Sequence, residues 1–225
     1  LMGEPRMSPT REALDALDLL VVLDIFMCET AKIADVVLPA ASFAEKDGTF
    51  TNTERRVQRV RAAIEPVGNS RPDWVIMCDL ARSLGYDWDY RHPSEIWDEM
   101  ARLTPTLAGI NYERIEGVGL QWPCRDREDS GTPVLHCEEF ACGLGQFFSL
   151  DHRDPAEMPD ADYPFILSTG RTLYHYNVGT MTRRSAASNE REPEAFLEIN
   201  VARGAKLGIA TGDKVKVTTR RGELT

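Results

Sequence analysis

The stretch TGRTLYHYNVGTMTRRS, residues 169–185, concentrates groups that bind phosphorylated ligands. It follows an apolar run, and at the end of such a run Thr169 and Gly170 can expose backbone N–H groups to an anion. Arg171 carries a planar guanidinium that can donate two parallel hydrogen bonds to phosphate oxygens. His175 can stack on a flat heterocycle or hydrogen-bond to it. These residue types predict a site for a phosphorylated heterocycle. The alternative is a polar surface loop whose charges face water.

Three charged residues in the N-terminal half are further candidates. Asp24 lies near the end of a continuous apolar run, where a carboxylate can accept two hydrogen bonds from the edge of a guanine base. Lys46 lies in the glycine loop AEKDGTFTN, which suits phosphate or ribose oxygens. Asp73 lies in the first turn of an expected helix. Each residue also has a structural interpretation: a turn or helix cap, a solvated cation, and a stabiliser of the helix N-terminus, respectively.

The elements that position these three residues indicate an α/β layer. Residues 19–26, LLVVLDIF, are typical of a parallel strand that is buried on both faces. Residues 35–39 predict a second strand, after a gap that holds one helical turn at most. Residues 70–85 predict a helix that Ser70 caps and Gly85 ends. Further helices are expected at 11–18 and 92–103.

The C-terminal part has a different pattern, which divides the chain into domains at 1–150 and 151–225. An irregular stretch with an acidic segment near 151–162 is the candidate linker between them. Short strands with short connections then predict a small β-rich domain, a barrel. Its expected elements are strands at 163–168 and 195–199, a helix that Asn200 caps and Gly208 ends, and a hairpin at 211–225.

Composition excludes several classes of partner. The 225 residues carry a net charge of −10, which argues against nonspecific binding to nucleic acid or to an anionic membrane. No apolar run approaches the roughly 20 residues of a membrane-spanning helix, and no signal peptide is visible. The first residue is not Met and the last residues begin a strand of a hairpin, so we interpret the chain as a piece of a longer polypeptide.

The cysteines favour a reducing compartment. The five cysteines are scattered along the chain and include no CxxC pair. A disulfide framework is therefore not expected, and we expect a cytoplasmic location. Cys124, His136, Cys137 and Cys142 match no zinc-site spacing, and no residue of the chain is assigned as a metal ligand.

Three long motifs, in the same order, carry a resemblance to a known family. The segment DIFMCETAKIADVVLPAASFAEKDGTFTNTERRVQ, residues 24–58, resembles the molybdenum or tungsten oxidoreductases that bind a bis-(molybdopterin guanine dinucleotide) cofactor. Residues 169–185 and 207–224 resemble the entry and the next stretch of the dinucleotide-binding domain of that family. Within the family, LDIFMCETAKIADVVLP and GLQWPCRD are similar to the catalytic subunits of formate dehydrogenases. Nitrate reductases share the loop at 169–185 and are the main alternative.

The resemblance implies both a fold and a cofactor. The fold is the end of a Rossmann-like α/β domain followed by the start of a double-psi, aspartate-decarboxylase-like β-barrel that binds the dinucleotide. Asp24 would bind guanine, Lys46 a phosphate or ribose, and Asp73 the nucleoside end. The pyrophosphate and pterin would be lined by Thr169, Gly170, Arg171, His175 and Asn177. We also expect Asp24 and Asp73 to face one cavity, and Arg171 and His175 to face a cavity in the second domain.

The implied activity is the oxidation of formate to carbon dioxide. Electrons would leave through iron–sulfur clusters to iron–sulfur or flavin subunits. The metal-ligating cysteine or selenocysteine and the 4Fe–4S cysteines are expected upstream, so no catalytic residue is assigned here. Two departures from the family pattern are the missing Asn in Met2–Pro5 and Leu23 in place of Gln. The alternative from another class is a free-standing cofactor-binding module without catalysis.

Overall fold

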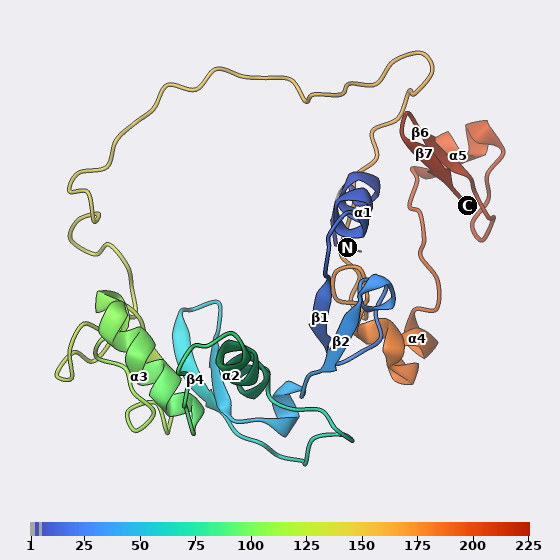
Figure 1. Ribbon diagram of the computed structural model, residues 1–225. Helices are drawn as coiled ribbons and strands as arrows, with labels where there is room; N and C mark the ends of the chain where they lie inside the picture. The colour runs from blue at the N-terminus through green and yellow to red at the C-terminus, as the bar shows by residue number, and fades with distance from the viewer. Residues whose placement is uncertain (1–2, 5) are drawn as a thin grey trace. The chain divides into compact units, whose positions relative to one another are not determined.

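The computed structural model describes residues 3–4 and 6–225, and its first sheet is formed by two parallel strands (Figure 1). The segment Met2–Pro5, which lacks the Asn of the family pattern, is described only in part, because Met2 and Pro5 lie outside the described residues. Strand β1, Val21–Asp24, pairs in parallel with β2, Val36–Pro39, and Asp24 lies opposite Pro39. The connection holds a single 3-10 turn, η1, Ala31–Ile33, as the short gap predicted.

The prediction that β1 is buried on both faces is wrong. Val21 is exposed and the other three residues of the strand are half-buried. Within the described residues only β2 pairs with it. The prediction that Asp24 ends the strand is confirmed.

Three α-helices belong to this part of the chain: α1, Met7–Asp15, α2, Asp73–Ser83, and α3, Pro93–Leu103. The expected capping of α2 by Ser70 is wrong, because Pro72 occupies the N-cap position and no side chain caps the helix. The Ser70 hydroxyl is buried without a hydrogen-bond partner among the described residues. Gly85 follows the end of α2 with a φ of +90°, a conformation that favours glycine, as its predicted role requires.

An antiparallel sheet and α3 enclose the core of the N-terminal unit. The sheet has the order β3, Gly48–Thr51, β4, Arg56–Val60, and β5, Leu120–Gln121. The indole N–H of Trp97 on α3 donates to the carbonyl oxygen of Ile110 over 2.9 Å. The core cluster consists of Val57, Trp97, Ala101, Ile110, Ile115 and Cys124. The irregular residues after α3 therefore supply half of this core, because they contribute its last three members.

The chain forms two units, Leu1–Gln146 and Phe147–Thr225. The second contains η4, Thr182–Arg184, α4, Ala186–Arg191, α5, Val201–Leu207, and a hairpin of β6, Val217–Thr219, and β7, Gly222–Leu224. The predicted ends of α5 are confirmed, because the Asn200 side chain accepts from the Arg203 amide and Gly208 is left-handed at φ +72°. The predicted hairpin is also confirmed, with its turn at Arg220–Arg221.

The strands predicted at 163–168 and 195–199 are wrong. Both segments are apolar, yet neither takes part in strand pairing. A strand requires a neighbour to complete its hydrogen bonds, and in the described part of this unit only β6 and β7 pair. The unit is therefore seen here as two short helices, a two-stranded hairpin and irregular connections.

Candidate cofactor-binding site

The carboxylate of Asp24 lies at the carboxyl end of β1 and organises the turn that follows. Its Oδ1 accepts the Phe26 backbone N–H over 2.9 Å, and its Oδ2 accepts the Cys28 thiol over 3.1 Å. The residue is half-buried. A carboxylate has about four acceptor positions, so two remain for a ligand at a strand end of the kind where α/β sheets bind ligands.

Lys46 and Asp73 are brought together by the fold although 27 positions separate them. The ammonium of Lys46 forms an ion pair with Oδ2 of Asp73, the first residue of α2. Both residues line a cavity of about 300 Å³ whose walls include the rings of Trp74, Trp97 and Tyr112. Asp24 does not line this cavity, which differs from our expectation that Asp24 and Asp73 share one.

A buried glutamate fixes the backbone just before Lys46. Glu45 ends the 3-10 turn η2, Phe43–Glu45, and is only 7% exposed. Its carboxylate accepts the Ser42 backbone N–H over 2.6 Å and the Val67 backbone N–H over 3.0 Å. These hydrogen bonds, of which the one from Ser42 has the largest effect, lower the pKa of Glu45 below its usual value. Sequence reasoning missed this residue, although the S-x-x-E spacing of Ser42 and Glu45 is the signal of a capping box.

The loop at 169–185 belongs to the second unit, and most of its predicted ligand groups are exposed. Thr169, Gly170, Arg171 and Asn177 all face solvent. Arg171 makes no hydrogen bond, ion pair or ring contact with any residue that the structure describes. Its guanidinium is therefore available to an anion from outside. Asn177 has a φ of +51°, the left-handed conformation that asparagine tolerates better than most residues.

His175 differs from the rest of the loop because it is 7% exposed and has protein partners at both ring nitrogens. Nε2 lies 2.8 Å from the Glu192 carbonyl oxygen, and Nδ1 lies 3.2 Å from the Thr182 hydroxyl. The Thr182 oxygen also accepts the Tyr176 backbone N–H over 3.1 Å. A histidine that donates from Nε2 and accepts at Nδ1 satisfies every one of these bonds. His175 thus holds the loop closed through bonds to protein groups.

Two more residues that sequence reasoning did not single out fix this loop. The Arg183 guanidinium donates to the Pro193 carbonyl oxygen over 3.0 Å, and the Asn189 side chain donates to the Arg183 carbonyl oxygen over 2.7 Å. Arg183 lies within the motif at 169–185, but the sequence carries no signal for the Pro193 carbonyl oxygen to which it donates. The loop therefore has a fixed interior and an exposed set of anion-binding groups.

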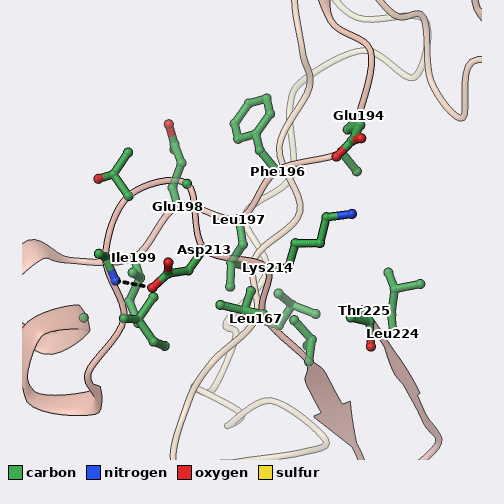
Figure 2. A pocket seen from close by; sticks show the side chains of 18 of the residues that line it. Leu167, Glu194, Phe196, Leu197, Glu198, Ile199, Asp213, Lys214, Leu224 and Thr225 are labelled. Atoms are coloured by element: carbon green, nitrogen blue, oxygen red, sulfur yellow. Dashed lines mark hydrogen bonds between the residues drawn. The ribbon is translucent and has the colours of Figure 1, made fainter.

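A large cavity of about 2150 Å³ lies in the second unit (Figure 2). Figure 2 shows apolar side chains of Leu167, Leu197 and Leu224 around it, with charged groups such as Glu198 and Lys214 nearby. Neither Arg171 nor His175 lines it.

The described residues offer binding groups and no set of metal ligands. No group of three His, Cys, Asp or Glu side chains in the described ranges is arranged to hold a metal ion, and all five cysteines are free. No helix in those ranges has the length and apolar content needed to cross a membrane. In the first unit the carboxylates of Asp24 and Asp73 can accept hydrogen bonds from a ligand, and in the second unit the guanidinium of Arg171 can donate hydrogen bonds to an anion.

Comparison with solved structures shows the fold. Acetylene hydratase from Pelobacter acetylenicus is similar with a TM-score of 0.66 and 19% sequence identity, over 95% of this chain and 31% of that one.

Curated relatives align with this chain at sequence identities of 45–50%. The F420-dependent formate dehydrogenase subunit alpha of Methanocaldococcus jannaschii is 49% identical over 229 residues, and the F420-dependent formate dehydrogenase 2 subunit alpha of Methanococcus maripaludis is 50% identical over 228. Each alignment covers 100% of this chain and 34% of the relative, so the chain spans about a third of their length. A putative formate dehydrogenase of Staphylococcus aureus is 45% identical over 214 residues, which are 94% of this chain and 22% of that protein.

Two family models match separate stretches in the order that the motifs predicted. The model described as Molybdopterin oxidoreductase matches residues 2–83, and the one described as Molydopterin dinucleotide binding domain matches residues 165–225. The first range contains Asp24, Lys46 and Asp73, and the second contains the loop at 169–185. Together with the relatives, these matches confirm the predicted resemblance to the molybdopterin oxidoreductases.

Proposed function

We propose that this chain is the cofactor-holding part of a formate dehydrogenase catalytic subunit. It would bind a molybdenum or tungsten bis-(molybdopterin guanine dinucleotide) cofactor. The names of the relatives support formate as the substrate of the whole protein, with carbon dioxide as the product. When bound, the cofactor would supply the redox chemistry for the two-electron oxidation of formate. The residues of this chain bind and orient that cofactor.

The observation that carries the proposal is the state of the loop at 169–185. Its interior is fixed by the buried His175, while the guanidinium of Arg171 is exposed and has no partner among the described residues. A fixed loop that presents a free guanidinium is prepared to bind a phosphate without reorganisation. We assign Arg171, with Thr169, Gly170 and Asn177, to the pyrophosphate and pterin, and His175 to the same loop as its structural support.

The N-terminal unit would hold the nucleoside parts. We assign Asp24 to guanine at the end of β1, and the pair of Lys46 and Asp73 to the nucleoside end at the cavity of about 300 Å³. The second unit would be the start of the double-psi barrel. The proposed domain boundary lies at residues 150 and 151.

The whole protein would act in the cytoplasm as one subunit of a complex. Its 4Fe–4S cluster and metal-ligating residue would lie in the rest of the polypeptide, and iron–sulfur or flavin subunits would carry the electrons onward. Two relatives are named as F420-dependent, so F420 is the first electron acceptor to assay.

The test is the substitution Arg171→Ala in the full-length enzyme. The affinity for the cofactor should fall roughly 30-fold or more, because truncation of one partner of a desolvated charge pair costs at least about 2 kcal/mol. Molybdenum or tungsten and guanine nucleotide per subunit should fall with it. Iron should remain. Arg171→Lys should recover part of the loss, since an ammonium keeps the charge but lacks the two-donor geometry.

The matched control is Arg153→Ala, an exposed arginine of the same unit outside the loop. It should leave metal and nucleotide content unchanged. Full metal and nucleotide content in Arg171→Ala would show that Arg171 is a solvated loop cation and would remove the main support of the proposal. Formate and nitrate assays on the wild type decide between the two substrates.

A further inference from the structure

We infer that Cys28 is a positioning residue that orients the carboxylate of Asp24 toward a guanine base. The inference rests on the proposed function, in which Asp24 binds guanine, and it names a second residue on which that recognition depends. In the sequence Cys28 is one of five scattered cysteines, and no spacing sets it apart. Its role follows from the hydrogen bond that its thiol donates in the folded chain.

The two carboxylate oxygens of Asp24 are held by different donors. The bond from the Phe26 backbone N–H to Oδ1, over 2.9 Å, forms the common turn in which an Asp side chain accepts from the backbone two residues later. This turn engages one oxygen only. The Cys28 thiol donates to the other oxygen, Oδ2, over 3.1 Å. Because both oxygens are bound, the carboxylate cannot rotate about its Cβ–Cγ bond without breaking a hydrogen bond.

The plane of the carboxylate decides whether it can recognise guanine. The ring N–H and the exocyclic amine of guanine are neighbouring donors in the plane of the base, so they require two acceptors side by side in that plane. Each carboxylate oxygen has about two acceptor positions, and the bonds from Phe26 and Cys28 occupy one on each oxygen. One position on each oxygen therefore remains for the base. A carboxylate that is already held in one plane loses less side-chain entropy when it binds.

Backbone hydrogen bonds support both residues. The Ala40 N–H, just after β2, donates to the Asp24 carbonyl oxygen over 3.2 Å. The Cys28 N–H donates to the Phe26 carbonyl oxygen over 2.8 Å, and the Cys28 carbonyl oxygen accepts the Lys32 N–H of η1 over 3.0 Å. The backbone that carries the thiol is therefore fixed on both sides. A binding group keeps its productive orientation when a second residue, itself supported in this way, holds it.

The thiol acts through Asp24 and not on the ligand. A thiol carries one hydrogen, and that of Cys28 is donated to the carboxylate. The sulfur that remains is a weak acceptor, which has little to offer the N–H groups of a base. The contact that we assign to this turn is therefore made by Asp24, and Cys28 sets its direction.

Substitution of Cys28 in the full-length enzyme tests the inference. Cys28→Ala removes the donor, whereas Cys28→Ser keeps a donor of similar size at the same position. The readout is the rate at which guanine nucleotide leaves the polypeptide during dialysis. Cys28→Ala should release it roughly three- to tenfold faster than the wild type, because one hydrogen bond from a weak donor is lost. Cys28→Ser should release it at a rate within about twofold of the wild type, because a hydroxyl also donates.

A double-mutant cycle with Asp24→Ala shows whether Cys28 acts through the carboxylate. The double variant should release the nucleotide at the rate of Asp24→Ala, because Cys28 has nothing to orient once the carboxylate is gone. The thermal midpoint of Cys28→Ala should stay close to that of the wild type, since the residue is half-buried and lies outside the core cluster. Cys137→Ala is the matched control. It removes another thiol of the same unit, which donates to the Val134 carbonyl oxygen over 3.4 Å, and should leave the release rate unchanged.

Two outcomes would show that Cys28 does not position Asp24. If Cys28→Ser releases the nucleotide as fast as Cys28→Ala, the size of the thiol matters and its hydrogen bond does not. If the rate increases of Cys28→Ala and Asp24→Ala multiply in the double variant, the two residues act independently. In both cases the inference is wrong, while the proposed function stands.

The inference and the proposed function can also fail separately. If Asp24→Ala accelerates release but Cys28→Ala does not, only the inference fails. If neither Asp24→Ala nor Arg171→Ala changes release, the proposed function fails, and the inference fails with it.

Discussion

Arg220 Nη1 donates a 2.6 Å hydrogen bond to Glu157 Oε1, although the two residues lie 63 positions apart. Glu157 Oε2 accepts from Arg221 over 2.6 Å, and Arg220 also pairs with Asp160. The Arg220 guanidinium lies 4.6 Å from the centre of the Tyr163 ring. These contacts, the hairpin ion-pair cluster, attach the acidic stretch that we predicted to be a linker to the turn between β6 and β7.

Substitution of Arg220 by Gln should release the acidic stretch. Asp160 Oδ1 accepts the backbone N–H groups of Asp162 and Tyr163 over 3.0 and 2.8 Å. These two amides should exchange with solvent roughly three- to tenfold faster in the variant, a modest change because each exposed ion pair contributes little to stability. Hydrogen exchange with mass spectrometry measures this. Lys216→Gln breaks the Glu223 pair in the same hairpin and should leave these amides unchanged. Equal exchange in both variants would show that the cluster does not order the stretch.

The same cluster should respond to pH. Hydrogen bonds from Arg221, which has the larger effect, and from Arg220 hold the pKa of Glu157 below its usual 4.5. Because the folded-state pKa is lower than the unfolded one, the ion pairs stabilise the cluster fully above about pH 4.5 and lose their effect as the pH falls through the lowered pKa. Carbon-13 NMR titration of the carboxylates should give a Glu157 midpoint below 4.5, which rises in Arg221→Gln. A midpoint that the substitution leaves in place would contradict the assignment.

His175→Ala should loosen the loop that carries Arg171. The change removes a buried ring with two hydrogen bonds and leaves the Glu192 carbonyl oxygen only the 3.5 Å contact from Arg183 Nη1, at a cost of roughly 1–3 kcal/mol. Faster hydrogen exchange of the Tyr176 and Gly179 amides is the expected result, because those amides close the loop. Tyr176→Phe, at a ring that is 75% exposed, serves as the control. Unchanged exchange in His175→Ala would mean that other contacts hold the loop.

Ile110→Ala should destabilise the N-terminal unit. Ile110 is fully buried in the core cluster, and loss of such a side chain costs about 2–5 kcal/mol. A urea titration followed by tryptophan fluorescence should show an earlier transition, because all four tryptophans lie in this unit and the indole of Trp97 donates to the Ile110 carbonyl oxygen. Val118→Ala, at a side chain that is 81% exposed, should not shift it. Similar midpoints for both variants would show that this cluster is not the core of the unit.

Elements with local signals were predictable from the sequence. Asn200 and Gly208 bound α5 because a cap and a left-handed glycine are decided by neighbouring backbone groups. The end of β1 at Asp24 follows equally from an apolar run that a charge interrupts. The prediction of strands at 163–168 and 195–199 is wrong because a strand forms only where a partner strand is available. The composition of a segment does not reveal that partner.

The candidate site shows the same division. The motif at 169–185 identified the residue types, but not that His175 is buried, because that depends on a carbonyl 17 positions later. The pairing of Lys46 with Asp73 joins residues 27 positions apart and has no local signal. The sequence therefore indicates which residues bind, whereas the fold decides which of them face a ligand and which support the others.

The apolar surface around the large cavity of the second unit affects how this unit behaves outside its parent polypeptide. Leu167, Phe196 and Leu224 line this cavity and are each at least half exposed, and exposed apolar surface promotes self-association. The apolar segments at 163–168 and 195–199 also keep unpaired backbone groups that a second molecule can pair with. Residues 147–225 produced alone should therefore scatter light and form concentration-dependent oligomers, even where the loop at 169–185 is correctly folded.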